Sequence, residues 1–477
     1  MNLRSKIKQF IFNDHEYPII AGFCIGFYML VFYYSNNFKL AHSWQQLLFF
    51  IGYYILVPVV VLFIVDRVIR KSPFAKYNRQ ALFVVTVLFF LFFVLQNIGS
   101  LNIRNFGLCC LAIVLLSFKF KNYKALLLVV LLMSIVPILH IGAFIYRCSL
   151  NNSDWNVQPD AILDTKFAVH PNVYFIEVDG YANDETLKSP LYRYDNSKFD
   201  NELKQYGFTL YDSFRSNYNS TLLSNASIFT MRHHYTRESS NFKYETDYIM
   251  DDNAVLKIFK NNGYKTFFIT ERPYLIMNRP DVKFDYCNFK SSELPYLKDG
   301  WVLYEEITNE IKSQIIKNKQ SRNFFFIQKF DPGHIAVSKG QSRGRDQERT
   351  EYLKKLEVAN LWLSDILAFI QKNDPKGLVI IGADHSGYVG FAYTHQVFRK
   401  IHDRDSLNSI FGAKLAVKWN DPSRVSYDKN LKTNVNLFRV VFSFLSRDST
   451  MLNHLQPDVS YHNYDGEDMG KIYKAIE

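Results

Sequence analysis

Cysteine is scarce in this chain of 477 residues, and the five cysteines do not form a disulfide framework. Cys24, Cys109 and Cys110 lie in apolar runs, which leaves Cys148 and Cys287 outside them. These two residues can form one disulfide or remain free thiols, and the sequence does not decide between the two states. Because no C-x-x-C pair is present, the sequence excludes a zinc site built from thiolates.

Acidic residues are almost missing from the first 150 residues, which hold three of them against 14 Lys and Arg. The rest of the chain holds 42 residues of each sign, so the whole net charge of +11 lies in the N-terminal part. A nucleic-acid-binding protein needs a basic face on its water-exposed domain. The balanced charge of residues 151–477 therefore argues against nucleic acid as a partner.

Five apolar segments follow one another in the N-terminal part, at 17–34, 47–65, 81–98, 106–118 and 125–146. Four of them are long enough to cross a bilayer core, which takes roughly 20 residues, and the fourth is shorter. A secretory signal peptide is a single such segment before a polar chain, so the cluster excludes one. We predict that residues 1–147 form a transmembrane domain of five helices.

Along this domain, loops rich in Lys and Arg alternate with loops that contain few of them. The N-terminus and the loops at 66–80 and 119–124 are rich, whereas the other two loops carry only Lys39 and Arg104. This alternation is the positive-inside pattern, with the N-terminus in the cytoplasm. It also favours counting the short fourth segment, because without it Arg104 and the 119–124 cluster would lie on one side. Five crossings then place everything after residue 146 outside the cytoplasm.

The remaining chain has the pattern of an α/β domain. Residues 148–170 are polar and are predicted to be a linker, followed by a domain at 171–477. Predicted strands lie at 172–178, 265–270, 323–329 and 378–381, and helical stretches such as 349–371 lie between them. Alternating strands and helices predict a mostly parallel sheet with helices on both faces.

Polar side chains follow three of the predicted strands directly. Because carboxyl ends of parallel strands meet at one edge of a sheet, residues far apart in the sequence can converge there. Carboxylate oxygens and imidazole nitrogens suit a divalent cation such as Zn²⁺ or Mn²⁺. Each residue alone can equally be an ordinary loop residue. The candidates, in chain order, are Asp179, Asp331, His334, Asp384, His385 and His395.

A threonine completes the candidate site. Ser220 or Thr221 is expected to cap a helix that begins at Leu222. A threonine hydroxyl becomes a nucleophile when a base or a metal lowers its pKa, and a helix N-terminus favours an incoming phosphate. A metal-bound Thr221 can thus attack phosphorus and form a covalent phosphoenzyme. Taken singly, Thr221 is more simply a helix cap, and only its combination with the strand-end residues supports chemistry.

Residues 171–445 resemble the alkaline phosphatase/sulfatase superfamily in three motifs: P-N-V-Y-F-I-E-V-D-G-Y at Asp179, T-L-L-S-N-A-S-I-F from Thr221, and A-D-H-S-G at Asp384. The nearest branch is the membrane-anchored one of lipoteichoic acid synthases and lipid A phosphoethanolamine transferases. Its five N-terminal helices and extracytoplasmic domain match the layout predicted here. The segments Y-D-N-S-K-F and N-L-F-R-V-V-F also resemble uncharacterised bacterial sulfatase-like membrane proteins, which we expect to be closest.

The resemblance implies an alkaline-phosphatase-like fold with Thr221 as the catalytic nucleophile. It implies one divalent metal, Zn²⁺ or Mn²⁺, whose ligands are Asp179, Thr221, Asp384 and His385. His334 and His395 match, more loosely, histidines that bind substrate phosphate or a second metal. Asp331 to His334 is similar to the D-x-x-G-H element of two-zinc phosphodiesterases but one residue shorter, so a second site of Asp331, His334 and His395 stays open.

The function implied is transfer of a phospho-alcohol head group, phosphoethanolamine or phosphoglycerol. The donor would be a phospholipid and the acceptor an envelope glycan, lipid or polymer, at the bacterial cytoplasmic membrane with the catalytic domain periplasmic or extracellular. Two alternatives remain: a phosphodiesterase or phosphatase, and a non-catalytic envelope assembly protein that retains the fold. Asp179 matches hydrolytic members, since the two transferase groups tend to have Glu there. The absence of C/S-x-P-x-R argues against a formylglycine sulfatase.

Overall fold

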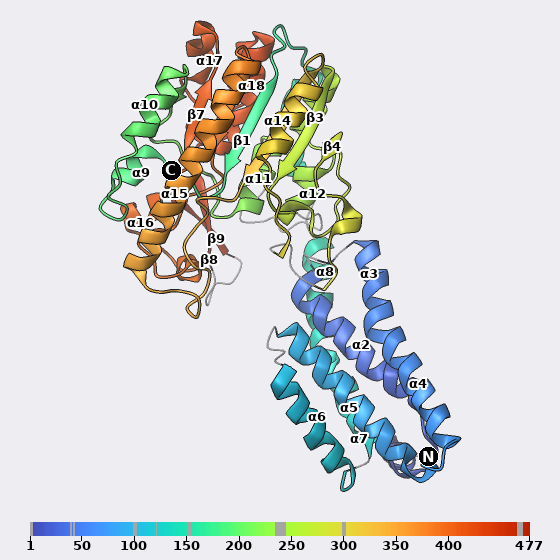
Figure 1. The fold of residues 1–477 in the computed structure, drawn as a ribbon. Coiled ribbons are helices and arrows are strands. Elements are labelled where there is room, and N and C mark those ends of the chain that lie inside the picture. Colours follow the sequence, from blue (N-terminus) through green and yellow to red (C-terminus); the bar gives the residue numbers. More distant parts are fainter. Residues whose placement is uncertain are drawn as a thin grey trace. The chain divides into compact units, whose positions relative to one another are not determined.

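The computed structural model describes residues 3–38, 41, 43–98, 103–120, 122–149, 154–233, 245–297, 302–464 and 471–477. The chain divides into two compact units, Met1–Leu150 and Asn151–Glu477 (Figure 1). Each unit has its own hydrophobic core. The two units are described separately below.

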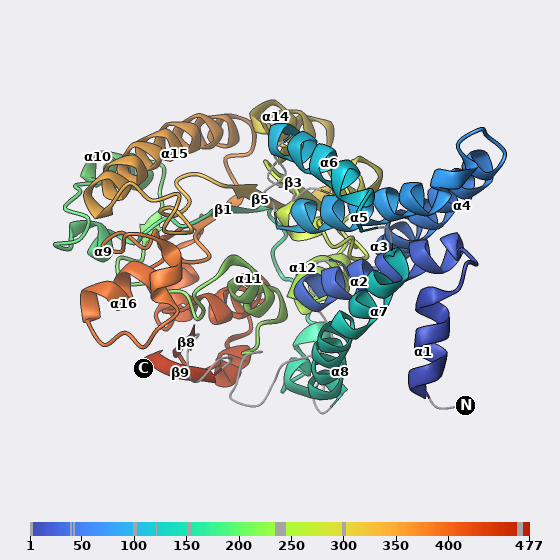
Figure 2. The ribbon, with the colours of Figure 1, turned by 90° about the horizontal axis from the view of Figure 1, so that it is seen from below.

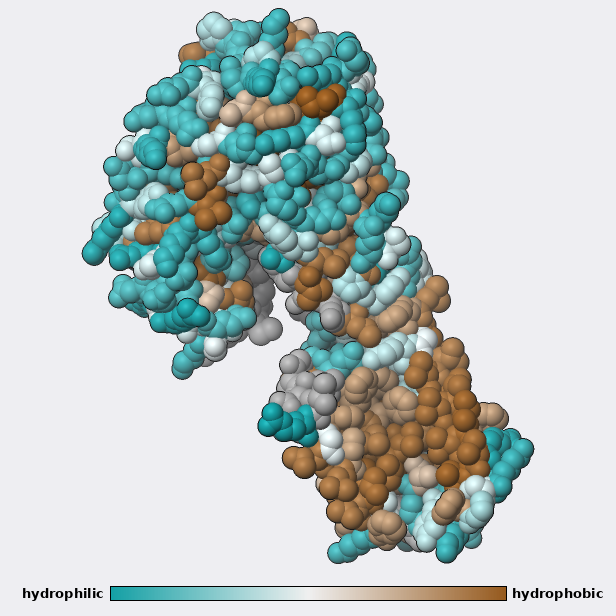
Figure 3. Space-filling view, in the orientation of Figure 1, coloured by the Kyte–Doolittle hydropathy of each residue, from teal (hydrophilic) through white to brown (hydrophobic). Residues whose placement is uncertain are grey.

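The first unit is a set of apolar helices. Among the described residues, four spans are long and apolar enough to cross a membrane: Pro18–Asn37, Trp44–Arg70, Ala75–Asn97 and Tyr123–Tyr146. Their apolar side chains form a brown band over the visible surface (Figure 3). A helix satisfies its own backbone hydrogen bonds, which is what a hydrocarbon environment demands. The helices are α1 (Leu3–Phe12), α2 (Pro18–Asn37), α3 (Trp44–Phe50), η2 (Ile51–Leu56), α4 (Val57–Arg70), η3 (Ala75–Tyr77), α5 (Asn78–Asn97), α6 (Ile103–Ser117), α7 (Tyr123–Met133) and α8 (Ile135–Ser149).

Four of the five predicted crossings thus have the required length, and the fourth predicted segment forms the shorter helix α6. The central helix is α2, which packs against α4, α5, α7 and α8. Gly22 and Gly26 allow this packing, because a Cβ on Gly26 would lie 2.1 Å from the carbonyl oxygen of Tyr54. Small residues four apart are a common means of close helix contact in membranes.

The second unit is built on a mostly parallel sheet, as predicted. Its seven strands, within the described residues, have the order β2-β7-β6-β1-β5-β3-β4. All pairs among β6, β1, β5, β3 and β4 are parallel, and β7 is antiparallel to both β6 and β2. The strands are β1 (Val173–Val178), β2 (Thr209–Leu210), β3 (Tyr264–Thr270), β4 (Tyr286–Cys287), β5 (Arg322–Lys329), β6 (Leu378–Gly382) and β7 (Leu415–Lys418), and β8 (Ser460–Tyr464) pairs with β9 (Lys471–Ile476) in a separate hairpin.

Helices cover both faces of this sheet. In Figure 2, α10 (Ser197–Gln205), α14 (Thr308–Lys317) and α15 (Arg345–Asn373) lie on one side of the strands, and α11 (Thr221–Thr230) and α12 (Glu245–Met250) on the other. The second face also receives α13 (Ala254–Asn261) and α18 (Leu437–Ser446), since Phe259 stacks on Phe324 and Phe438 packs edge-on against Phe175. Every residue of β1 is buried, which is typical of a parallel strand covered on both faces.

Part of the segment that we expected to be a linker, 148–170, packs against the second unit. Phe167 is buried, with its ring centroid 5.6 Å from that of Phe442. The carboxylate of Asp160 lies 2.6 Å from the buried guanidinium of Arg439. Part of this segment therefore contributes an ion pair and a buried ring to the second unit. Cys287 is a free thiol, and the side chain of Cys148 lies outside the described residues.

Candidate active site

Asp179 is fixed at the carboxyl end of β1. Its N–H donates to the carbonyl of Lys329 at 2.9 Å, and its own carbonyl accepts from the N–H of Gly333 at 2.8 Å. The next residue, Gly180, has φ of 67°, and a Cβ there would lie 2.0 Å from the carbonyl oxygen of Gly333. The ends of β1 and β5 are therefore clamped together, and this clamp holds the carboxylate of Asp179 at the sheet edge.

Thr221 is the first residue of α11, one residue earlier than expected, and Ser220 is its N-cap. The Ser220 side chain makes no capping hydrogen bond. The Thr221 hydroxyl does not cap either. Its Oγ1 lies 3.3 Å from Asp179 Oδ1 and 3.3 Å from His385 Nε2. The interpretation of Thr221 as a simple helix cap is therefore wrong, and its oxygen joins the strand-end residues.

Asp384 and His385 lie two and three residues beyond the end of β6, and both are buried. Asp384 Oδ1 accepts from the N–H of Gly180 at 3.2 Å, whereas its Oδ2 is buried with no hydrogen-bond partner among the described residues. Nδ1 of His385 lies 2.8 Å from the carbonyl oxygen of Ser386. A carbonyl can only accept, so Nδ1 carries the proton and Nε2 offers a lone pair toward Asp179 and Asp384.

Asp179, Asp384 and His385 form the one group of metal-ligand side chains found within the described parts of the chain, with ligand atoms inside 4.8 Å of one another. Nε2 of His385 lies 3.5 Å from Asp179 Oδ1 and 3.3 Å from Asp384 Oδ2. Two carboxylates, an imidazole and the Thr221 hydroxyl are a donor set that fits a divalent first-row cation. The unpartnered Oδ2 of Asp384 is a ligand atom that such an ion would satisfy.

The electrostatics of the cluster also fit a cation. Burial and the neighbouring charge of Asp384 raise the pKa of the Asp179 carboxyl. Across the described residues, no Lys or Arg forms an ion pair with either carboxylate. Two buried acids without a basic partner carry a large desolvation penalty, and a bound divalent cation would compensate it.

Of the other three predicted residues, only His334 lies close to the ligand cluster. His334 belongs to the site: its ring centroid lies 6.1 Å from that of His385, and burial lowers the pKa of His334 to about 4. Asp331 instead pairs with Lys329 at 3.2 Å. His395 is exposed, with its ring beside Phe398. Within the described residues, Asp331, His334 and His395 do not gather into a second metal site.

Two tyrosines at the site were not predicted. The ring of Tyr388 stacks on that of His385 with centroids 5.0 Å apart, and its hydroxyl donates to the carbonyl of Asn219 at 2.6 Å. It thereby ties the metal-ligand loop to the turn before Thr221. Burial and the charges of Asp179 and Asp384 raise the pKa of Tyr274, so the Tyr274 hydroxyl is electrostatically coupled to the two carboxylates. The only sequence signal was that Tyr388 follows His385 by three residues.

A buried acid beneath the site was also missed. Glu177 precedes Asp179 by two residues, so both side chains lie on the same face of the strand. Glu177 Oε1 accepts from Gln328 Nε2 at 2.9 Å and from Asn225 Nδ2 at 3.0 Å. These bonds connect β1, β5 and α11 one turn below Thr221. An acidic residue inside an otherwise apolar strand was the signal for this network.

Comparison with known proteins identifies the class. Residues 171–439, more than half of the chain, match the Sulfatase family. The chain therefore belongs to the sulfatase family, within the alkaline phosphatase/sulfatase superfamily, and is an enzyme of that family. A search of curated proteins finds no significant match.

Several solved structures are similar to the chain. One is the integral membrane protein lipooligosaccharide phosphoethanolamine transferase A from Neisseria meningitidis, with 12% identity, a TM-score of 0.38, and 90% of this chain and 96% of that chain covered. Another is the C-terminal periplasmic domain of EcEptC from Escherichia coli in complex with Zn, with 10% identity, a TM-score of 0.42, and coverage of 65% and 93%. The lipoteichoic acid synthase LtaP from Listeria monocytogenes shows 12% identity, a TM-score of 0.39, and coverage of 62% and 78%.

Proposed function

We propose that this enzyme is a metal-dependent transferase that moves a phospho-alcohol head group, phosphoethanolamine or phosphoglycerol, from a phospholipid to an envelope glycan, lipid or polymer. The observation that carries the proposal is the position of Thr221. Its hydroxyl oxygen lies 3.3 Å from one carboxylate and 3.3 Å from one imidazole of the ligand cluster. A hydroxyl held against such groups at a helix N-terminus has the setting of an activated nucleophile.

The first half-reaction uses this hydroxyl. Thr221 Oγ1 donates its hydrogen bond to Asp179 Oδ1, which is the acceptor for the proton as the oxygen bonds to phosphorus. The bond between phosphorus and the glycerol oxygen of the phospholipid breaks, and diacylglycerol leaves with a proton. Since Ser220 makes no capping bond, the first N–H groups of α11 are available to the phosphoryl oxygens.

The second half-reaction releases the group. A hydroxyl of the acceptor attacks phosphorus of the phosphothreonine, the bond from phosphorus to Oγ1 breaks, and Oγ1 regains a proton. His334 is neutral at pH 7 because burial lowers its pKa to about 4, and we assign it to contact the phosphoryl group. A Zn²⁺ or Mn²⁺ ion held by Asp179, Thr221, Asp384 and His385 would lower the pKa of the hydroxyl and stabilise charge on the phosphoryl oxygens.

The membrane unit supports a lipid donor. We propose five crossings within residues 1–147, a cytoplasmic N-terminus and a catalytic domain at 171–477 outside the cytoplasm of a bacterial cell. The alternation of basic loops supports this orientation. A domain anchored in this way works at the bilayer surface, where the phospholipid and the envelope acceptor are both at hand.

Labelled lipid tests the proposal. The full chain in proteoliposomes, supplied with Zn²⁺ or Mn²⁺, is incubated with head-group-labelled phosphatidylethanolamine or phosphatidylglycerol and with an envelope extract. We expect diacylglycerol to accumulate and the label to move to a component of the extract. Label released as a free phospho-alcohol would make the protein a phosphodiesterase. An absence of turnover in protein that binds the metal would support the non-catalytic alternative.

A further inference from the structure

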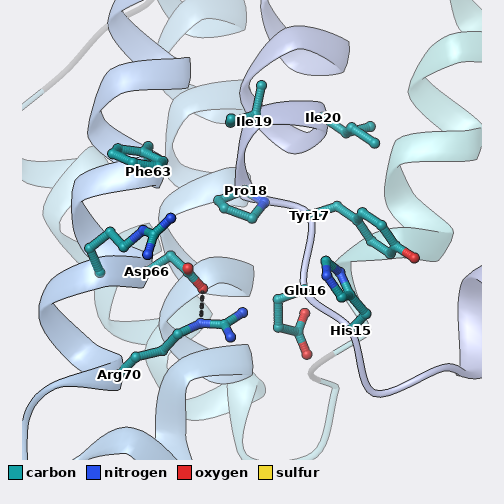
Figure 4. A pocket seen from close by; sticks show the side chains of 10 residues that line it. His15, Glu16, Tyr17, Pro18, Ile19, Ile20, Phe63, Asp66 and Arg70 are labelled. Carbon is teal, nitrogen blue, oxygen red and sulfur yellow. Dashed lines mark hydrogen bonds and ion pairs between the residues drawn. The ribbon is translucent and has the colours of Figure 1, made fainter.

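A pocket of about 480 Å³ lies in the first unit, between the segment before α2 and the C-terminal half of α4 (Figure 4). Its volume is in the range of small-molecule sites. One wall is apolar and made of Ile19, Ile20 and Phe63, which are 53%, 42% and 39% exposed. The other wall is charged and made of Glu16, Asp66, Arg67 and Arg70.

The acids of the charged wall are already paired. Asp66 Oδ1 accepts from Arg70 Nε at 2.8 Å (Figure 4) and from Asn78 Nδ2 at 2.7 Å. Glu16 Oε1 accepts from Arg79 Nε at 2.6 Å. Each carboxylate in the pocket therefore has its own cation.

Arg67 differs from these residues because no carboxylate of the described chain lies within ion-pair distance of it. Its guanidinium lies over the ring of Phe63, 5.1 Å from the centroid. Arg70 contacts Asp66 through Nε, and 48% of its side chain is exposed, so the guanidinium is only partly covered. The pocket thus offers one unneutralised positive charge and a second exposed guanidinium one helical turn away.

The pocket lies where the apolar surface of the first unit ends. Along α4, the exposed Val60, Phe63 and Ile64 come just before Asp66, Arg67 and Arg70. Figure 3 shows the matching change from a brown band to teal side chains at the lower end of the unit. Such a border is where the hydrocarbon core of a bilayer meets its head groups. With the orientation proposed above, the leaflet at this end is the cytoplasmic one.

We propose that this pocket binds the phosphodiester head group of a phospholipid from that leaflet. The phosphate oxygens bond to Arg67 and Arg70, whose planar guanidinium groups match phosphate geometry, and the lipid chains cover Ile19, Ile20 and Phe63. Basic pockets on the cytoplasmic side of helical membrane proteins suit lipid head groups. A free phosphate would satisfy the arginines but leave the apolar wall uncovered. This site lies in the first unit and does not depend on the proposed transfer reaction, whereas its assignment to the cytoplasmic leaflet rests on the proposed orientation.

Lipid retention by the full chain tests the site. Native mass spectrometry in detergent micelles measures the binding of dioleoylphosphatidylglycerol to wild type, Arg67→Gln and Lys119→Gln. Lys119 is a matched control because it also lies over an aromatic ring, that of Phe120 at 5.5 Å, but outside the pocket. We expect Arg67→Gln to weaken binding about tenfold, as loss of a charge-assisted hydrogen bond does, and Lys119→Gln to leave it unchanged.

Four further outcomes test the proposed ligand and the site. Ile20→Trp, which fills the apolar wall and keeps both arginines, is expected to lower lipid binding as well, so the test does not depend on the folding of one variant. Dioleoylglycerol binding as tightly as the phospholipid would overturn the role of the phosphate. Glycerol 3-phosphate displacing the lipid at equal concentration would overturn the lipid in favour of a soluble phosphate. Equal binding by wild type and a folded Arg67→Gln would overturn the site itself.

Discussion

Thr221 and Ser220 both carry a hydroxyl at the start of α11, but only the Thr221 oxygen contacts the ligand cluster. We expect Thr221→Ala to abolish the covalent intermediate and to lower head-group release by at least about a thousandfold, as removal of a nucleophile does. Intact-protein mass spectrometry after incubation with phosphatidylethanolamine should show an added phosphoethanolamine on wild type and none on Thr221→Ala. Ser220→Ala, the matched control, should still gain this mass. A mass gain on Thr221→Ala would contradict the mechanism.

Asp384 is fully buried, and its Oδ2 has no hydrogen-bond partner among the described residues. Mutation of residues that hydrogen-bond to a metal's ligands typically weakens metal binding roughly 10- to 100-fold. Asp384→Asn changes a proposed ligand itself, so we expect a larger loss of metal affinity. Elemental analysis of the dialysed full chain, compared with wild type, measures this directly and needs no substrate.

Asp331→Asn is the control for this measurement, because the Asp331 carboxylate pairs with Lys329 and lies outside the cluster. It should retain the metal content of wild type. Loss of metal in this variant, or two ions per wild-type chain, would support a second metal site that includes Asp331.

At the scale of elements, the network under the site holds α11 against the sheet. Asn225→Ala removes one of the two donors to Glu177 Oε1 and leaves a buried carboxyl less satisfied. We expect a loss of about 1–3 kcal/mol in the free energy of unfolding, seen as a Tm lower by several degrees. Ser227→Ala is the control on the same helix, since the Ser227 hydroxyl bonds only locally to the carbonyl of Ser224. Equal losses in the two variants would argue against the network.

The strands show what a sequence can and cannot predict. β1, β3, β5 and β6 were predicted because each contains a run rich in apolar, β-branched or aromatic residues next to turn residues. β2 and β4 have two residues each and β7 has four, which is too short for any period to show. Their existence depends on pairing with neighbours that the sequence does not identify. The mostly parallel sheet with helices on both faces followed from the alternation of strands and helices, but the strand order and the edge strands required the structure.

The candidate site also contains residues that the sequence indicated and residues that it did not. Asp179, Asp384 and His385 were candidates because they lie at or just after the ends of predicted strands, and Thr221 because it lies at the start of a predicted helix; the family resemblance then joined them into one site. Tyr388 stacks on His385, and the pKa of Tyr274 responds to the charges of Asp179 and Asp384; no local sequence pattern reveals such interactions between separate segments. His395 matched a histidine of the family only loosely, and the structure leaves it exposed beside Phe398.

At the scale of the whole molecule, three histidines make the second unit sensitive to acid. Burial lowers the pKa of His233, His334 and His462 to about 4. An unfolded histidine titrates near 6.5, so the unfolded state binds more protons between pH 6.5 and 4. Stability is therefore full above pH 6.5 and falls as the pH drops toward 4, by up to about 1.4 kcal/mol per pH unit for each histidine.

Thermal unfolding between pH 4 and 7, with a chelator present, checks this dependence. His233→Gln should show a shallower fall of Tm with decreasing pH than wild type. His402→Gln, at an exposed position, should follow the wild-type curve. Parallel curves for wild type and His233→Gln would show that another group is responsible.

The number of membrane crossings decides on which side the catalytic domain works, and α6 is the helix in question. Its 15 residues give a length of about 22 Å, against roughly 30 Å of hydrocarbon, so a crossing requires local thinning of the bilayer or help from flanking residues. The charge pattern favours the crossing, because it keeps Lys119 on the same side as Lys71.

Single cysteines in a cysteine-free background resolve this question. In spheroplasts, a membrane-impermeant maleimide should label Lys376→Cys in the catalytic domain but not Lys71→Cys or Lys119→Cys, all three being exposed positions. If α6 did not cross, the last span would start outside the cell. Lys119→Cys would then be labelled and Lys376→Cys would be protected, and a cytoplasmic catalytic domain could not reach an envelope acceptor. The labelling pattern therefore tests the helix count, the orientation and the proposed acceptor class together.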